Sequence, residues 1–137
     1  MRDLGPDEGK HDTSDPKTKE LRTLRRTMSA LDAKIAAHKQ HLAEMLPGIR
    51  NIPRGAPAAE LRAAYLAVKE GDAQQRAALA AEPAADELRA GFVVALDSPD
   101  AALATGRTCL DALTSVEASL AAAEDGYRQM IDLGLSY

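Results

Sequence analysis

A repeat of mostly apolar side chains, spaced alternately by three and four residues, runs through residues 21 to 45. Its members are Leu21, Leu24, Met28, Leu31, Ile35, His38, Leu42 and Met45. Side chains at these spacings lie on one side of an α-helix, and a repeat of this length is typical of coiled-coil-like packing. This seam, as we call the set, predicts a long helix that packs along another helix.

The composition favours helices in the rest of the chain. Hydrophobic residues make up 45% of the sequence, aromatic residues only 3%, and there is no tryptophan. Much of the apolar fraction is alanine, which has the highest helix propensity, and leucine is close behind. With so few large side chains, the core must be built from leucine and from alanine surfaces that approach closely.

Helix start and stop signals divide the sequence into four expected helices. Asp15 followed by Pro16 is typical of a helix start, and Pro47 with Gly48 is typical of an end. The expected helices span residues 15–46, 57–81, 84–96 and 99–132, with a connector over 47–57. In the second helix, Gly71 and Asp72 favour a kink or a break.

Apolar stripes indicate which sides of the later helices are buried. The second helix has Leu61, Tyr65, Val68 and Leu79. The last helix has Leu103, Leu110, Leu113, Val116, Leu120, Tyr127 and Ile131, with Gly106 and Ala123 in other turns of that face. Together the patterns predict an all-α fold, an elongated four-helix bundle with long first and last helices and coiled-coil-like packing. We expect a single helical domain over residues 15–137 and a disordered tail over residues 1–14.

The length of the first helix bears on the shape of the molecule. At 1.5 Å per residue it would be about 45 Å long. A compact sphere formed by this chain would be only about 37 Å across. The protein is therefore expected to be elongated, or to have the end of that helix covered by another chain.

Charge is distributed unevenly along the sequence. Residues 15–54 hold nine Lys and Arg against four Asp and Glu, whereas residues 55–137 hold six against thirteen. The net charges of +5 and −7 are complementary. We expect the basic first helix to face the acidic remainder, within one chain or across a dimer.

The sequence favours a soluble, cytoplasmic protein. Cys109 is the only cysteine, so no internal disulfide forms, and we expect a buried, inert thiol. The N-terminal residues have acids and prolines in place of the apolar stretch of a signal peptide. No segment approaches the roughly 18 apolar residues that span a bilayer, so no membrane association is expected.

Two histidines on the first helix raise the question of a metal site. His38, His41 and Glu44 form an H-x-x-H-x-x-E pattern, which brings two imidazoles to neighbouring helix positions. Two ligands from one helix make at most half a site. We therefore expect no metal and no cofactor. His38 is interpreted as a polar seam residue that sets register or partner choice, with its pKa lowered by burial.

A basic face on the same helix suggests a second possible function. Lys19, Arg22, Arg25 and Arg26 lie close together and could contact phosphates. No aromatic residues interleave with them, and such charge runs are usually solvated or paired. Nucleic-acid binding is therefore the alternative hypothesis. Nothing in the sequence has the spacing of a catalytic site, so neither catalytic residues nor enzymatic activity are expected.

The segment TCLDALTSVEASLAAAEDGYRQMIDLGLSY, residues 108 to 137, resembles the second helix of WXG100-type substrates of type VII secretion. The resemblance implies an alanine-rich helical protein that is exported without a signal peptide. Two features depart from the family. No Trp-x-Gly turn is present, and Asp132 follows Tyr127 by five residues, where the family's signal places an acid after four.

These observations favour a protein–protein interaction module, of an assembly, adaptor or chaperone-like kind, that acts through the packing of helix faces. The expected partner is a second copy of the chain or another helical protein, and the seam is the expected contact surface. A small regulator that binds nucleic acid and a type VII secretion substrate are the alternatives.

Overall fold

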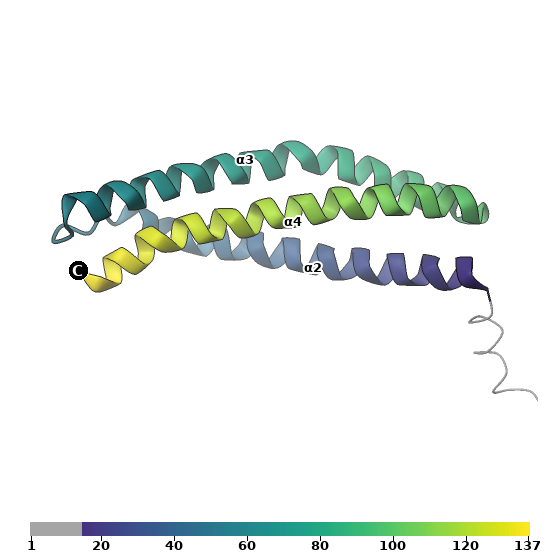
Figure 1. The fold of residues 1–137 in the computed structure, drawn as a ribbon, viewed down its shortest axis with the longest axis horizontal. Helices are drawn as coiled ribbons and strands as arrows, with labels where there is room; N and C mark the ends of the chain where they lie inside the picture. Colours follow the sequence, from purple (N-terminus) through teal and green to yellow (C-terminus); the bar gives the residue numbers. More distant parts are fainter. Residues whose placement is uncertain (1–14) are drawn as a thin grey trace, which may run out of the picture.

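A computed structural model describes residues 15–137 as three long helices that run up, down and up (Figure 1). They are α2 (Pro16–Arg50), α3 (Ala58–Val94) and α4 (Pro99–Ser136), and a short 3-10 turn, η1 (Ala95–Asp97), links the last two. The all-α fold is confirmed, and no strand occurs among the described residues. The tail expected over residues 1–14 lies outside them.

The bundle has three helices where four were expected, because α3 continues through Pro83. A proline inside a helix leaves the carbonyl four residues earlier without its partner. Here both Pro83 and Leu79 are exposed, so water can reach that carbonyl. Buried Ala78 and Ala85 hold the helix in the core on either side of the proline. The stabilisation from tertiary packing therefore exceeds the local cost of the proline, and the helix continues.

Two other helix ends also lie further along the chain than expected. Pro47 stands inside α2, which continues to Arg50, and Gly134 does not end α4. Ile49 is partly buried against the core, which favours the extra turn of α2. The expected starts are confirmed: Asp15 caps α2 by accepting a hydrogen bond from the Lys17 amide at 3.1 Å, and α4 begins at Pro99.

The core combines large side chains from one helix with small ones from another. From α2 come Leu24, Met28, Leu31, Ile35, Leu42 and Met45. From α3 come Ala64, Gly71, Ala78, Ala85 and Phe92, each seven residues from the last. The helix α4 packs against both α2 and α3, and its expected stripe is buried or half-buried throughout. A core of leucine and alanine is thus confirmed, whereas the coiled-coil-like character of the packing stays a prediction.

The backbones of α3 and α4 approach closely at two glycines. A Cβ atom on Gly126 would lie 2.4 Å from the carbonyl oxygen of Ala67 and 3.2 Å from the Cα of Gly71. A Cβ on Gly71 would meet the Tyr127 ring at 2.9 Å. Gly71 therefore does not break the helix, since its role is to let α4 come close.

The whole bundle is elongated, which resolves the question raised by the length of its first helix (Figure 1). At 1.5 Å per residue, each of the three helices is about 52 to 57 Å long. They cover one another from end to end, so the length of α2 does not require a second chain. No helix within residues 15–137 is both long and apolar enough to cross a membrane.

Candidate functional site

The seam of α2 lies in the core of its own chain. Six of its eight members are buried there, and Leu21 packs partly buried at one end. The seam faces α4 and also reaches Phe92 of α3 in a single core cluster. The partner of the seam is therefore the rest of the same bundle, and a contact surface for a second protein has to be sought elsewhere.

His38, the remaining member, lies half-buried at the edge of the core between two glutamates of α4. Its Nδ1 atom is 2.7 Å from Glu124 Oε1, and its Nε2 atom is 2.8 Å from Glu117 Oε2. An imidazole can donate from both nitrogens only when it is protonated. With a carboxylate at each nitrogen, the arrangement favours the imidazolium ion.

The electrostatics of His38 differ from the sequence-based expectation. Burial alone lowers the pKa of the imidazole, but hydrogen bonds and charge attraction from Glu124 and Glu117 outweigh it, so the pKa is raised. The expected lowering is therefore wrong. The prediction assumed that the imidazole lies in an apolar layer. The sequence alone does not show that two carboxylates of α4 lie beside the ring.

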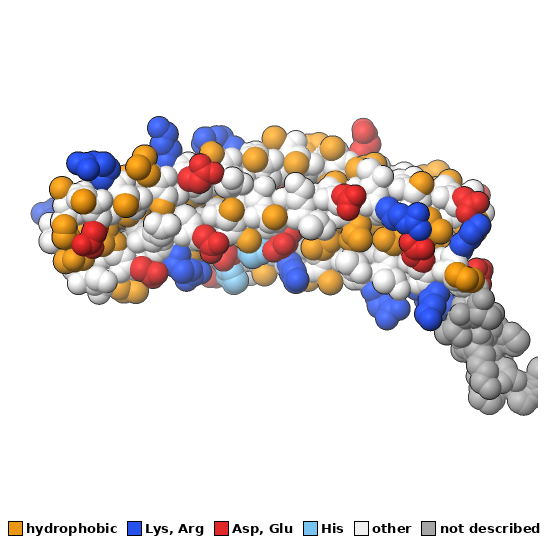
Figure 2. Space-filling model, in the orientation of Figure 1, with side chains coloured by type: hydrophobic (Ala, Val, Ile, Leu, Met, Phe, Trp, Pro, Cys, Tyr) orange, Lys and Arg blue, Asp and Glu red, His pale blue; other side chains and the backbone are white. Residues whose placement is uncertain are grey.

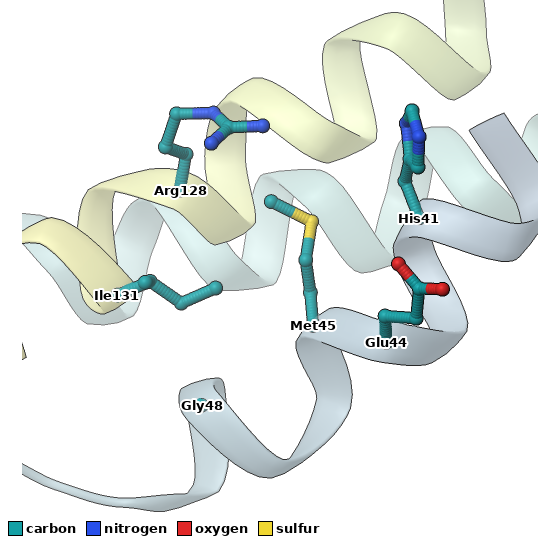
Figure 3. A pocket seen from close by; sticks show the side chains of 6 residues that line it. All are labelled: His41, Glu44, Met45, Gly48, Arg128 and Ile131. Carbon is teal, nitrogen blue, oxygen red and sulfur yellow. The ribbon is translucent and has the colours of Figure 1, made fainter. Parts of the chain in front are cut away.

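His41 joins this cluster from the outside of α2. Its Nδ1 atom lies 3.2 Å from the same Glu124 oxygen. Glu44, which the sequence pattern paired with the histidines, accepts a hydrogen bond from Gln40 at 3.2 Å. Glu44 and His41 instead line a surface cavity of about 390 Å³ together with Arg128 (Figure 3).

Sequence reasoning missed the two glutamates that complete the cluster. Glu117 and Glu124 are seven residues apart, which places them on one face of α4. That spacing was the available signal. Without the register between α2 and α4, however, nothing in the sequence directs them to His38 rather than to solvent.

The basic face of α2 is exposed. Lys19, Arg22, Arg25 and Arg26 are all on the surface, and none forms an ion pair with another residue in the range 15–137. The expected docking of the basic segment on the acidic remainder is seen elsewhere, where Lys17 pairs with Asp100 at 2.7 Å and Lys39 with Glu82.

In other ion pairs the acid comes from α2 and the arginine from α3 or α4, which is the opposite of the expected arrangement. Arg107 of α4 pairs with Glu20 of α2 at 2.6 Å, and Arg89 of α3 pairs with Asp32. Exposed pairs of this kind contribute at most about 1 kcal/mol each. Charge complementarity between segments therefore accompanies the packing of the helices and does not determine it.

Two residues singled out in the last helix are buried. Cys109 is fully enclosed beside the Ala85 carbonyl, and burial raises the pKa of its thiol, as expected for an inert cysteine. Tyr127 donates a hydrogen bond to Asp72 of α3, and burial and that carboxylate raise its pKa to about 12. The tyrosine of the secretion-like segment is thus part of the α3–α4 contact.

The outer side of α3 exposes five of the large apolar side chains of the described residues. Their exposed fractions are 46% for Tyr65, 61% for Leu66, 53% for Leu79, 59% for Val93 and 80% for Val94. Tyr65 and Leu79 were expected to be buried. They are not, because α3 turns its row of small residues toward α4 instead.

Comparison with models of protein families, with curated proteins and with solved structures found no match.

Proposed function

We propose that this chain is a protein–protein interaction module that pairs with a second copy of itself through the outer face of α3. The observation that carries the proposal is the set of large apolar side chains exposed on α3, namely Tyr65, Leu66, Leu79, Val93 and Val94. Several large apolar side chains exposed on one helix of a folded domain favour an interaction site there.

A line of small side chains also runs along this side of α3, beside the exposed cations Arg62, Lys69 and Arg76. Its exposed alanines are Ala59, Ala63, Ala73, Ala77, Ala80 and Ala84. With Leu66, they follow alternating steps of three and four residues, interrupted only at Glu70. These steps are typical of two helices that lie side by side, and small side chains let the backbones approach closely. The face therefore suits a helix as its partner.

Charges along α3 favour an antiparallel second copy as that helix. The exposed cations Arg62 and Lys69 lie in its first half beside the exposed acids Glu60 and Glu70, and Arg76 lies at its midpoint, whereas the exposed charges of its second half are the acids Asp86 and Glu87. In Figure 2 the basic groups on the edge formed by α3 gather toward the end where this helix begins. Antiparallel pairing sets the cations of each copy against the acids of the other, and a twofold interface requires this self-complementarity.

Cysteine cross-linking tests both the surface and the direction of pairing. In a Cys109→Ala background, Ala77→Cys lies near the middle of α3, where the two copies of an antiparallel pair cross. It should form a disulfide-linked dimer under mild oxidation. Ala59→Cys, near the helix start, should not, because it faces the other end of its partner.

The controls decide between the remaining outcomes. Leu66→Lys introduced into the Ala77→Cys protein should abolish the cross-link, since it places a charge in the line of small side chains. Leu135→Lys, at a still more exposed leucine near the end of α4, should leave it intact. Equal cross-linking at residues 59 and 77 would mean parallel pairing, and its absence at residue 77 would contradict the proposal.

The exposed basic face of α2 favours nucleic-acid binding as a second candidate. The carrying observation is that Lys19, Arg22, Arg25 and Arg26 have no carboxylate partner within the described range. Any such binding must weaken steeply as salt rises, because it rests on phosphate contacts, so it is tested at about 150 mM salt. Sub-micromolar affinity in an anisotropy titration, lost on changing the three arginines to glutamate, would favour this candidate.

A further inference from the structure

Three potential metal ligands from two helices converge beside the core. His38 and His41 come from successive turns of α2, and Glu124 comes from α4. The Glu124 Oε1 atom lies 2.7 Å from His38 Nδ1 and 3.2 Å from His41 Nδ1. One nitrogen from each imidazole and this oxygen all lie within 4.8 Å of one another. Within residues 15–137, this is the one such group of histidine, cysteine and acidic side chains.

The surrounding side chains hold two of these groups in place. Glu117 lies one heptad before Glu124 on α4, and its Oε2 atom is 2.8 Å from the other nitrogen of His38. A carboxylate on the far nitrogen of a ligating histidine fixes both the tautomer and the ring orientation. Arg128 lies 3.9 Å from Glu124 Oε2, which leaves Oε1 directed toward the histidines.

We propose that His38, His41 and Glu124 bind a divalent transition-metal ion such as zinc, which links α2 to α4. Imidazole nitrogen with carboxylate oxygen is a ligand set suited to such ions. Glu117 acts as the positioning residue for His38. The two glutamates together carry two negative charges, which match those of a divalent ion.

Two of the three ligand separations are close to those of a metal site, and the third, between the two imidazole nitrogens, is within 4.8 Å. Ligand atoms about 2.0 Å from a tetrahedral zinc ion lie about 3.3 Å from one another. The separation of His41 Nδ1 from Glu124 Oε1 already matches this value at 3.2 Å. The His38 contact has to open by about half an ångström, which a small side-chain rotation provides.

A fourth position is available on the solvent side. His41 also borders the cavity that is lined by Glu44, Met45 and Arg128 (Figure 3). A water molecule that enters from this cavity can complete the coordination, as one does in zinc sites with three protein ligands. The ion would therefore sit at the edge of the bundle.

Calorimetric titration of the untagged, full-length protein with zinc chloride tests the site. We expect one saturable site per chain and a rise in melting temperature that excess chelator reverses, because the ion joins two helices. Glu117→Gln should weaken zinc binding about 10- to 100-fold, as is typical for a positioning carboxylate. His41→Gln and Glu124→Gln should weaken it further.

Matched variants separate this site from the alternatives. Glu44→Gln removes a neighbouring acid that the proposal leaves out, so it should bind zinc like the wild type. Leu66→Lys should do the same, which distinguishes failure of this site from failure of the α3 interface. Circular dichroism of each variant confirms that it is folded, and His41 is exposed enough to be replaced without disturbing the core.

Two results would overturn the proposal. One is the absence of saturable zinc binding by the wild type at micromolar protein. The other is binding that survives both His41→Gln and Glu124→Gln in folded protein, since the ion would then sit elsewhere on the surface.

Discussion

At the scale of single residues, the hydrogen bonds between His38 and the two glutamates, Glu117 and Glu124, make the free energy of unfolding depend on pH. The imidazole of the unfolded chain titrates near pH 6.5, and the folded protein raises that pKa. The folded state therefore binds the proton more tightly. The resulting stabilisation is fully present below about pH 6.5 and is lost as the pH rises through the folded pKa.

We therefore expect His38→Leu to destabilise the protein most in mild acid. The variant removes the donor to Glu117 and one of the partners of Glu124, at a cost of about 2 kcal/mol, comparable to one charge-assisted hydrogen bond. The difference from wild type should shrink as the pH rises above about 6.5. Urea unfolding from pH 5.5 to 8.5, in buffer with a chelator, measures it. Parallel curves for the two proteins, or a difference that grows with pH, would contradict this account of His38.

The contrast at His38 shows what sequence can and cannot predict about this site. The repeat placed His38 in line with Ile35 and Leu42, and the structure puts it at the edge of the same core. Its partners lie 79 and 86 residues away in sequence. A contact of that range depends on the register between α2 and α4, which local patterns do not specify.

At the scale of the helices, the close approach of α3 and α4 depends on a glycine without room for a side chain. Gly126→Ala would place a methyl group 2.4 Å from a backbone carbonyl that cannot move without shifting α3. We expect a loss of about 3 kcal/mol, at the upper end of overpacking in cores. Chemical denaturation followed by circular dichroism measures the change.

Gly134→Ala is the matched control on the same helix. No atom lies within 4 Å of the position that its Cβ would take. Alanine has a higher helix propensity than glycine, so stability should stay the same or rise by up to about 1 kcal/mol. If both variants lose similar stability, helix propensity rather than the α3–α4 contact governs these positions.

The elements also show where local signals are sufficient. The pairs Asp15–Pro16 and Ser98–Pro99 each combine a polar residue with a following proline, and both mark helix starts in the structure, although only Asp15 caps its helix with its side chain. Pro83 could not be interpreted in the same way. Whether a proline breaks a helix depends on whether its freed carbonyl faces water or the core, and that is decided by packing with α4.

At the scale of the whole molecule, α3 has a partner on only one side. Its inner row of small residues is covered by α4, whereas its outer side exposes Leu66, Leu79 and Val94. Sequence reasoning placed the interaction surface on the α2 seam, because a long heptad repeat predicts packing without saying whether the partner is internal. The seam packs against the rest of the same chain. The exposed apolar surface is on α3, where alanines on all sides of the helix leave little difference in hydrophobicity between its faces in the sequence.

The central claim is that this outer face of α3 joins two copies of the chain. Sedimentation equilibrium of the untagged protein over a range of micromolar concentrations tests it most directly, since the mass of one chain is 14.5 kDa. The account predicts a concentration-dependent rise toward twice that mass, and a Leu66→Lys variant that stays at the mass of one chain. A wild-type protein that keeps the mass of a single chain at every concentration would contradict it.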